Sequence, residues 1–190
     1  MIYFIGTILF YLLGKRKFNP FSHLINITFL LYIPWLMSLT IFPIPIDSRL
    51  IQSFIETNTE ARNSFIPLQT ISMSISGAIE QGYFSGFIKG ILGNIIMMIP
   101  LGFYLPFIKP KLNSFRNILI VGIIAATSIE ITQKVISLVI GASYRSFDVD
   151  DIILNTIGVL LGSIALRFIN PIVKRLKDDI EDNHSETITS

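Results

Sequence analysis

Long apolar runs separated by short charged clusters are the feature that most limits how this chain can fold. Five such runs cover residues 1–14 and about residues 24–42, 87–108, 117–140 and 149–169. Four of them reach the ~20 residues that a helix needs to cross a hydrocarbon core of about 30 Å. The first is shorter, and Lys15, Arg16 and Lys17 follow it, which is the wrong order for a cleaved signal peptide. The sequence therefore predicts an all-α polytopic membrane bundle of about five transmembrane helices.

Composition excludes several other classes of protein. Hydrophobic residues make up 51% of the chain and charged residues only 15%, whereas a soluble domain carries about 25% charge. The formal net charge is +2 and no basic stripe interleaves with aromatic residues, so nucleic acid is not an expected partner. The chain has no cysteine, which excludes disulfides, thiol catalysis and cysteine-ligated metals. Its two histidines, His23 and His184, lie near opposite ends of the chain, which disfavours histidine-ligated zinc.

Basic residues are distributed unevenly among the connections between these runs. If the helices alternate in direction, three dense clusters fall on one side: Lys15, Arg16 and Lys17; Lys109, Lys111 and Arg116; and Lys174, Arg175 and Lys177. The connections on the other side hold Arg49, Arg62, Lys89 and Arg145, spread over far more residues. Because cytoplasmic connections carry an excess of Lys and Arg, we expect a multi-pass protein with its N-terminus outside and its C-terminus in the cytoplasm. Residues 1–170 would form the membrane domain, and the charged residues 171–190 a disordered cytoplasmic tail.

The longest connection, residues 43–86, lies between the second and third expected spans on the outer side. Within it, residues 48–55 have the pattern of a short amphipathic helix. Such a segment lies on the membrane surface, folds back as a lid, or is simply an ordered connector. The sequence leaves these alternatives open.

Polar and ionisable residues occur inside the spans or at their outer ends, where charges are costly and suggest function. We take eight of them as candidate ligand-binding residues: Asn94, Glu130, Gln133, Arg145, Asp148, Asp150, Asp151 and Asn155. At a rise of 1.5 Å per residue, the four that lie within spans sit roughly 9 to 15 Å below the outer boundary. The spacing therefore predicts a polar funnel that opens outward, with Arg145 and the aspartates at its mouth.

Three interpretations of this funnel stay open. Structurally, Glu130 could be neutralised by proton uptake, or be hydrogen-bonded to Gln133, Asn94 or Asn155 across helices, with these polar contacts holding the helices together. Arg145 could instead hold a phosphate or carboxylate head group while carboxylates hold hydroxyls or a cation. In a catalytic interpretation, Glu130 is the candidate general acid or base. Alternatively, Asp148 and Asp151 are candidate ligands of a divalent ion that bridges to phosphate. No cofactor is indicated by any motif.

Gly158 and Gly162 form a GxxxG pair in the last run. This spacing permits close approach of two helices, and packing is its expected role.

Three ordered motifs resemble those of the VanZ-like family. They are residues 94–102 (NIIMMIPLG), residues 128–133 (SIEITQ), and residues 145–158 (RSFDVDDIILNTIG) continuing to Gly162. Residues 65–68 (FIPL), with Thr70 and Ile71, are similar to a weaker motif of the outer loop. The resemblance covers roughly residues 20–169, with one departure at Met98, where the family pattern has phenylalanine.

The resemblance implies a bacterial plasma-membrane protein with a role at the cell envelope, because the family's named member is associated with resistance to the lipoglycopeptide teicoplanin. Seven of the eight candidates, all except Asp150, are motif positions. The implied partners are membrane lipids and a polar-headed amphiphile: a lipoglycopeptide, a lipid-linked cell-wall precursor or a phospholipid. The alternatives are an enzyme that modifies an envelope lipid and a structural or assembly protein.

Overall fold

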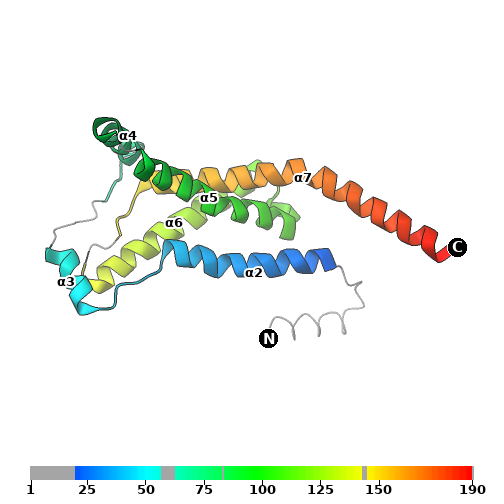
Figure 1. Ribbon diagram of the computed structural model, residues 1–190, viewed down its shortest axis with the longest axis horizontal. Helices are drawn as coiled ribbons and strands as arrows, with labels where there is room; N and C mark the ends of the chain where they lie inside the picture. Colours follow the sequence, from blue (N-terminus) through cyan, green and yellow to red (C-terminus); the bar gives the residue numbers. More distant parts are fainter. Residues whose placement is uncertain (1–19, 57–62, 83, 143–144, 190) are drawn as a thin grey trace.

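The computed structural model is an all-helical bundle (Figure 1). It describes residues 20–56, 63–82, 84–142 and 145–189, with side chains between residues 23 and 171. The helices in chain order are α2 (Pro20–Thr40), α3 (Ser48–Glu56), α4 (Gln69–Gln81), α5 (Ser85–Ile108), the 3₁₀ turn η1 (Pro110–Leu112), α6 (Phe115–Ile140) and α7 (Val149–Thr189). No strand is formed by the described residues, in agreement with the predicted fold class.

Four of these helices are long and apolar enough to cross a membrane. The segments that meet this condition are His23–Thr40, Ser85–Ile108, Phe115–Ile140 and Val149–Pro171. They match the second to fifth runs predicted from the sequence. The first predicted span, residues 1–14, lies outside the described residues.

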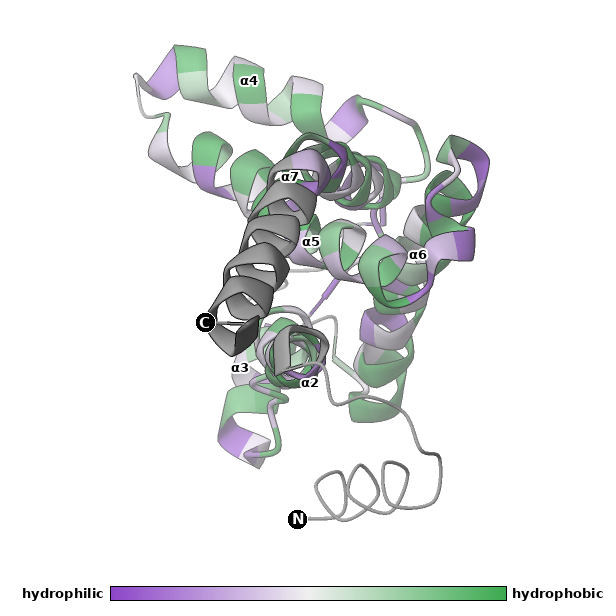
Figure 2. Ribbon diagram, turned by 90° about the vertical axis from the view of Figure 1, so that its right-hand side faces the viewer, coloured by the Kyte–Doolittle hydropathy of each residue, from purple (hydrophilic) through white to green (hydrophobic). Residues whose placement is uncertain are grey.

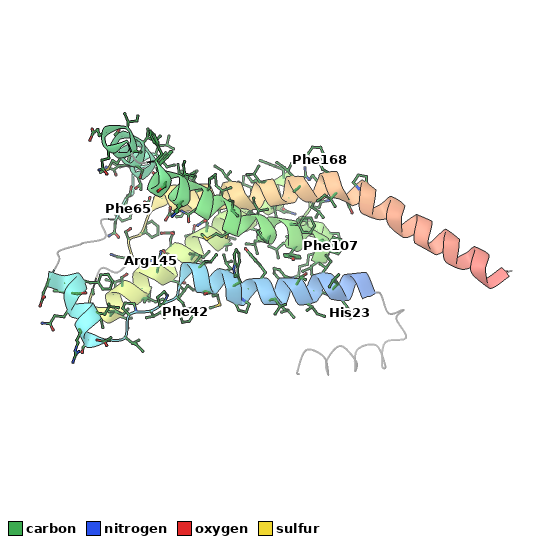
Figure 3. All side chains as sticks on the ribbon, in the orientation of Figure 1. His23, Phe42, Phe65, Phe107, Arg145 and Phe168 are labelled. Carbon is green, nitrogen blue, oxygen red and sulfur yellow. The ribbon has the colours of Figure 1, made fainter. Side chains whose placement is uncertain are left out.

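The four long helices run side by side, so that their connections gather at two ends of the bundle (Figure 1). One end holds the last residue of α2 and of α6 and the first residue of α5 and of α7. We call it the acidic end, because Asp148, Asp150 and Asp151 lie there. We call the other end the basic end, because the connection from α5 to α6 places Lys109, Lys111 and Arg116 there. Figure 3 shows Phe42, Phe65 and Arg145 toward the acidic end and Phe107 and Phe168 away from it.

Glycines bring α5 and α7 into backbone contact, and this is the most extensive helix pair in the bundle. A Cβ atom added to Gly158 would collide with the carbonyl oxygen of Ile95, and one added to Gly162 would collide with that of Ile99. Gly102 on α5 makes the reciprocal approach to the carbonyl oxygen of Val159. The packing role predicted for the GxxxG pair is therefore confirmed.

The small core lies where α2, α5, α6 and α7 meet, around Tyr32, Met98, Ile118 and Val159. Outside it, many large apolar side chains are exposed, and hydrophobic residues make up much of the long helices (Figure 2). Val139, for example, is 81% exposed. In water such a surface would be unfavourable, because contiguous exposed apolar area drives association. It suits helices whose outer surface is covered by lipid tails.

Two helices occupy the long connection at the acidic end. α3 confirms the amphipathic helix predicted at residues 48–55. α4 was not predicted, because its apolar residues, such as Met73 and Ile79, alternate with serine and glycine and give only a weak helical pattern. In the view along the bundle, α3 and α4 lie on opposite sides of it (Figure 2).

The backbone of residues 171–189 differs from the expected disordered tail. α7 continues as one helix through Pro171 to Thr189. The helix started by the packed first half of α7 needs no new nucleation to extend, since propagation is easier than nucleation.

Candidate functional site

The loop before α4 is joined to the start of α7 by a short backbone ladder. Ser64 and Asp148 form an isolated parallel bridge, in which Ser64 N donates to Phe147 O at 2.9 Å and Val149 N donates to Ser64 O at 3.0 Å. The side-chain oxygen of Asn63 accepts the N–H of Phe147 at 3.0 Å. These bonds bring the 65–71 segment against residues that are more than 70 positions later in the chain.

Asp148 and Glu130 organise the beginning of α7. Asp148 Oδ1 accepts the N–H of Asp150 at 2.9 Å, which is the bond that an N-cap side chain makes to the second helical residue. Glu130 Oε2, on α6, accepts the N–H of Asp148 at 3.0 Å. Glu130 is only 1% exposed, so this bond lies inside the protein. Two of the predicted site residues therefore hold the connection between α6 and α7.

Asp150 caps α4 rather than its own helix. Its carboxylate accepts the N–H of Leu68 and the N–H of Ile71 at 3.0 Å. Leu68 has a φ of 66°, the left-handed region that a side chain disfavours, and it makes no side-chain cap of its own. A carboxylate at a helix N-terminus satisfies free N–H groups and interacts well with the helix dipole. The chain thus uses Asp150 to fix α4 over the start of α7.

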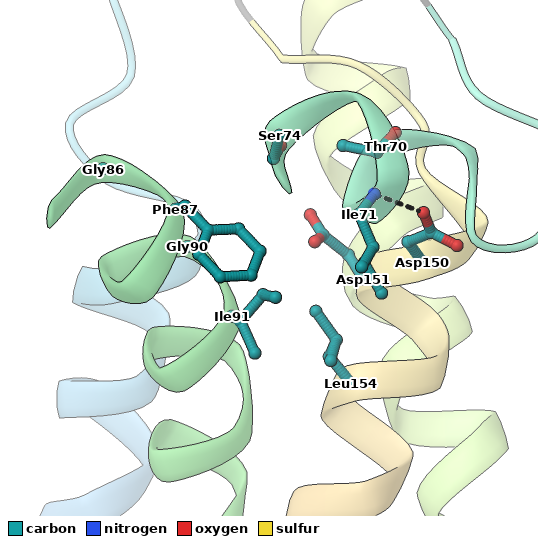
Figure 4. A pocket seen from close by; sticks show the side chains of 10 residues that line it. All are labelled: Thr70, Ile71, Ser74, Gly86, Phe87, Gly90, Ile91, Asp150, Asp151 and Leu154. Atoms are coloured by element: carbon teal, nitrogen blue, oxygen red, sulfur yellow. Dashed lines mark hydrogen bonds between the residues drawn. The ribbon is translucent and has the colours of Figure 1, made fainter. Parts of the chain in front are cut away.

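Asp151 belongs to a cleft between α4, α5 and α7 (Figure 4). On the α5 side, Asn94 donates an amide hydrogen of its side chain to Asp151 Oδ1. The cleft has a volume of about 120 Å³. It is lined by Thr70, Ile71, Ser74, Gly86, Phe87, Gly90, Ile91, Asp150, Asp151 and Leu154. Its walls thus combine carboxylates and hydroxyls with aliphatic and aromatic side chains.

The remaining predicted residues lie outside this cleft. Gln133 donates from Nε2 to the carbonyl oxygen of Thr40 at 2.7 Å and so joins α6 to the end of α2. The backbone of Arg145 exchanges two hydrogen bonds with the Ser137 hydroxyl, and its charge interacts with those of Glu130 and Asp151. Asn155 is buried, and its side-chain oxygen has no hydrogen-bond partner among the described residues.

The eight predicted residues are therefore close in space but divided in what they contact. Within the described residues, no group of three or more histidine, aspartate or glutamate side chains is placed to hold a metal ion. Thr70, Ser74 and Phe87 were missed as site residues. Thr70 and Ser74 are four residues apart, a spacing that places two hydroxyls on one helix face. That signal is visible only once α4 is known to be a helix.

The fold and the surface identify the class of the molecule: it is a polytopic α-helical membrane protein with a buried polar cluster at one end of its bundle. A family model described as VanZ/LLP1 matches residues 29–170, well over half of the chain. The chain belongs to the VanZ/LLP1 family, as its motifs predicted. No curated protein and no solved structure matches the chain significantly.

Proposed function

We propose that this protein recognises the polar head of an amphiphile in the outer leaflet, at the cleft between α4, α5 and α7 that Asp151 lines. The observation that carries the proposal is the mixed lining of this cleft. Asp151 and the hydroxyls of Thr70 and Ser74 are polar, whereas Phe87 and Ile91 are apolar. Such a lining suits a ligand with a polar head and an apolar continuation, because few polar groups fix orientation while apolar walls supply contact area.

The volume of the cleft limits what enters it. Sites that enclose a drug-sized ligand have volumes of roughly 300–1,000 Å³, whereas this cleft has about 120 Å³. It accommodates the end of a head group, such as an amino or hydroxyl-bearing group, and the rest of the amphiphile stays outside. A phospholipid, a lipid-linked wall precursor and a lipoglycopeptide all present groups of this size.

Charge favours a head group that donates hydrogen bonds. The charged residues that line the cleft are Asp150 and Asp151, and both are acidic. Asp150 is already bonded to two N–H groups of α4, so Asp151 is the carboxylate that a ligand would meet. An ammonium or hydroxyl group pairs with a carboxylate, whereas a phosphate would be repelled. Arg145, the predicted phosphate contact, does not line the cleft and would meet a phosphate only beside it.

The distribution of basic residues supports a position of this cleft outside the cell. Lys109, Lys111 and Arg116 lie at the basic end, and residues 174–177 of α7 add further positive charge beyond it. Under the positive-inside bias the basic end is cytoplasmic. The acidic end then faces the compartment in which cell-wall precursors and lipoglycopeptides act, and a role in teicoplanin susceptibility is part of this proposal.

Binding is favoured over catalysis by the position of Glu130. A general acid or base must come within about 3 Å of the proton that it transfers. Glu130 is buried and bonded to the backbone of Asp148, and it does not line the cleft. An enzyme that modifies an envelope lipid remains the alternative, and its discriminating result is a product that accumulates when lipid is incubated with the wild-type protein.

Native mass spectrometry of the detergent-purified protein tests the proposal. Wild type, Asp151→Asn and Glu80→Gln are compared, each alone and after addition of phosphatidylethanolamine, phosphatidylglycerol or teicoplanin. Glu80 is an exposed carboxylate on α4, at the same end of the bundle but outside this cleft, so its substitution is the matched control. We expect one retained ligand to be lost in Asp151→Asn and kept in Glu80→Gln. Equal retention by all three proteins would remove the support for a site at the cleft.

A further inference from the structure

We propose that α3 is a membrane-surface helix, which lies in the lipid interface at the acidic end with its apolar face inserted among the head groups. This proposal concerns a surface apart from the cleft. It holds for either orientation of the protein in the membrane, because it states only which end of the bundle carries the helix.

The sequence of α3 separates polar and apolar residues completely. Leu50, Ile51, Phe54 and Ile55 fall within one arc of the helix, since they follow each other at spacings of one and three residues. Every other residue of α3 is polar or charged. This segregation is typical of helices that lie in a membrane interface with one side in water.

The apolar face of α3 is only partly covered by the described chain: Leu50 and Ile55 are exposed, whereas Ile51 and Phe54 are half-buried. No residue of α3 is buried, and α3 makes little contact with the other described helices. It lies beyond the end of α2 at the acidic end (Figure 1). Leu50 is 50% exposed. A helix that served as a lid on the bundle would bury this face against other helices.

The surface that α3 continues is the lipid-facing surface of α2. From Leu39 near the end of α2, exposed apolar residues follow at Phe42 and Ile46, and the latter is 89% exposed. Between Ile46 and α3 lies a hollow of about 310 Å³ whose lining is apolar apart from Asp47. Because α2 is a membrane-spanning helix, lipid covers its exposed side. We therefore expect the same lipid to fill this hollow and to cover the apolar face of α3.

The charges of α3 indicate how it binds. Its charged residues are Arg49 and Glu56, which cancel. Attraction to anionic lipids requires clustered Lys or Arg, and α3 has a single arginine and no such cluster. Insertion of apolar side chains is therefore the driving force, and binding is expected to be the same in neutral and in anionic bilayers.

Single-cysteine labelling of the full-length protein tests this proposal, and the native chain offers no competing thiol. Leu50→Cys and Gln52→Cys are prepared separately, labelled with an environment-sensitive fluorophore and reconstituted in phosphatidylcholine nanodiscs. These two residues are both exposed but lie on opposite faces of α3. Nitroxide-labelled lipid and aqueous iodide are then compared as quenchers.

We expect the ratio of lipid quenching to iodide quenching to be several-fold higher for the label at position 50 than at position 52. The ratio should not change when phosphatidylglycerol replaces part of the phosphatidylcholine. Equal ratios at both positions would overturn the proposal, because the helix would then lie in water. Protection of position 50 from both quenchers would overturn it as well, since protein and not lipid would cover the face.

Discussion

Glu130 accepts the backbone N–H of Asp148 at 3.0 Å, and this bond joins α6 to the N-cap residue of α7. Both residues are buried, so no water competes for the bond. Glu130 was predicted as a ligand-binding or catalytic residue of a polar funnel. In the structure it is also a hydrogen-bond acceptor that holds the backbone beside the cleft.

Replacement of Glu130 separates its acceptor role from its charge. Glu130→Leu leaves the N–H of Asp148 buried without a partner, which costs about 1–3 kcal/mol. Glu130→Gln keeps an oxygen of similar position. We expect a lower thermal unfolding temperature in detergent for Glu130→Leu and a value near wild type for Glu130→Gln. If the two variants unfolded at the same reduced temperature, the charge and not the hydrogen bond would be what the fold requires.

The contact between α5 and α7 predicts a strong asymmetry among glycines. Gly158→Ala and Gly162→Ala would force a methyl group into the backbone of α5, and overpacking of this kind costs about 1–3 kcal/mol. Gly93→Ala is the control, because a Cβ at that position would meet no atom beyond the local backbone of its own helix within 4 Å. We expect lower unfolding temperatures and poorer monodispersity for the first two variants only. A Gly158→Ala protein as stable as Gly93→Ala would contradict backbone contact between these helices.

The membrane helices were predictable because length and hydropathy determine which segments cross a bilayer. The separate roles of the three aspartates were not predictable from the sequence. Asp148, Asp150 and Asp151 look equivalent in sequence, yet Asp148 caps α7, Asp150 caps α4, and Asp151 accepts a hydrogen bond from Asn94 beside the cleft. Side chains on a helix point in directions 100° apart for adjacent residues. Which residue each aspartate contacts therefore depends on where α4 lies. The weak apolar periodicity of α4 does not allow this helix to be predicted from the sequence.

The capping of α4 by Asp150 predicts a local effect on backbone exchange. Asp150→Ala removes the acceptor of the Leu68 and Ile71 N–H groups. Loss of a helix cap costs about 0.5–2 kcal/mol, and 1.4 kcal/mol corresponds to a tenfold change in an equilibrium. We expect amide hydrogen exchange in residues 68–72 to become about tenfold faster. Glu80→Ala, an exposed position on the same helix, is the control, and equal exchange in the two variants would rule out the cap.

The charge distribution predicts that thiol reagents distinguish the two ends of the bundle in intact cells. Gln81→Cys lies at the end of α4 near the acidic end, and Lys111→Cys lies in the α5–α6 connection at the basic end. Both positions are exposed, so orientation alone decides their access to a membrane-impermeant maleimide. With the basic end cytoplasmic, the cysteine at position 81 should react in intact cells and the one at position 111 only after permeabilisation. The reverse pattern would place the cleft inside the cell, where the proposed extracytoplasmic ligands could not reach it.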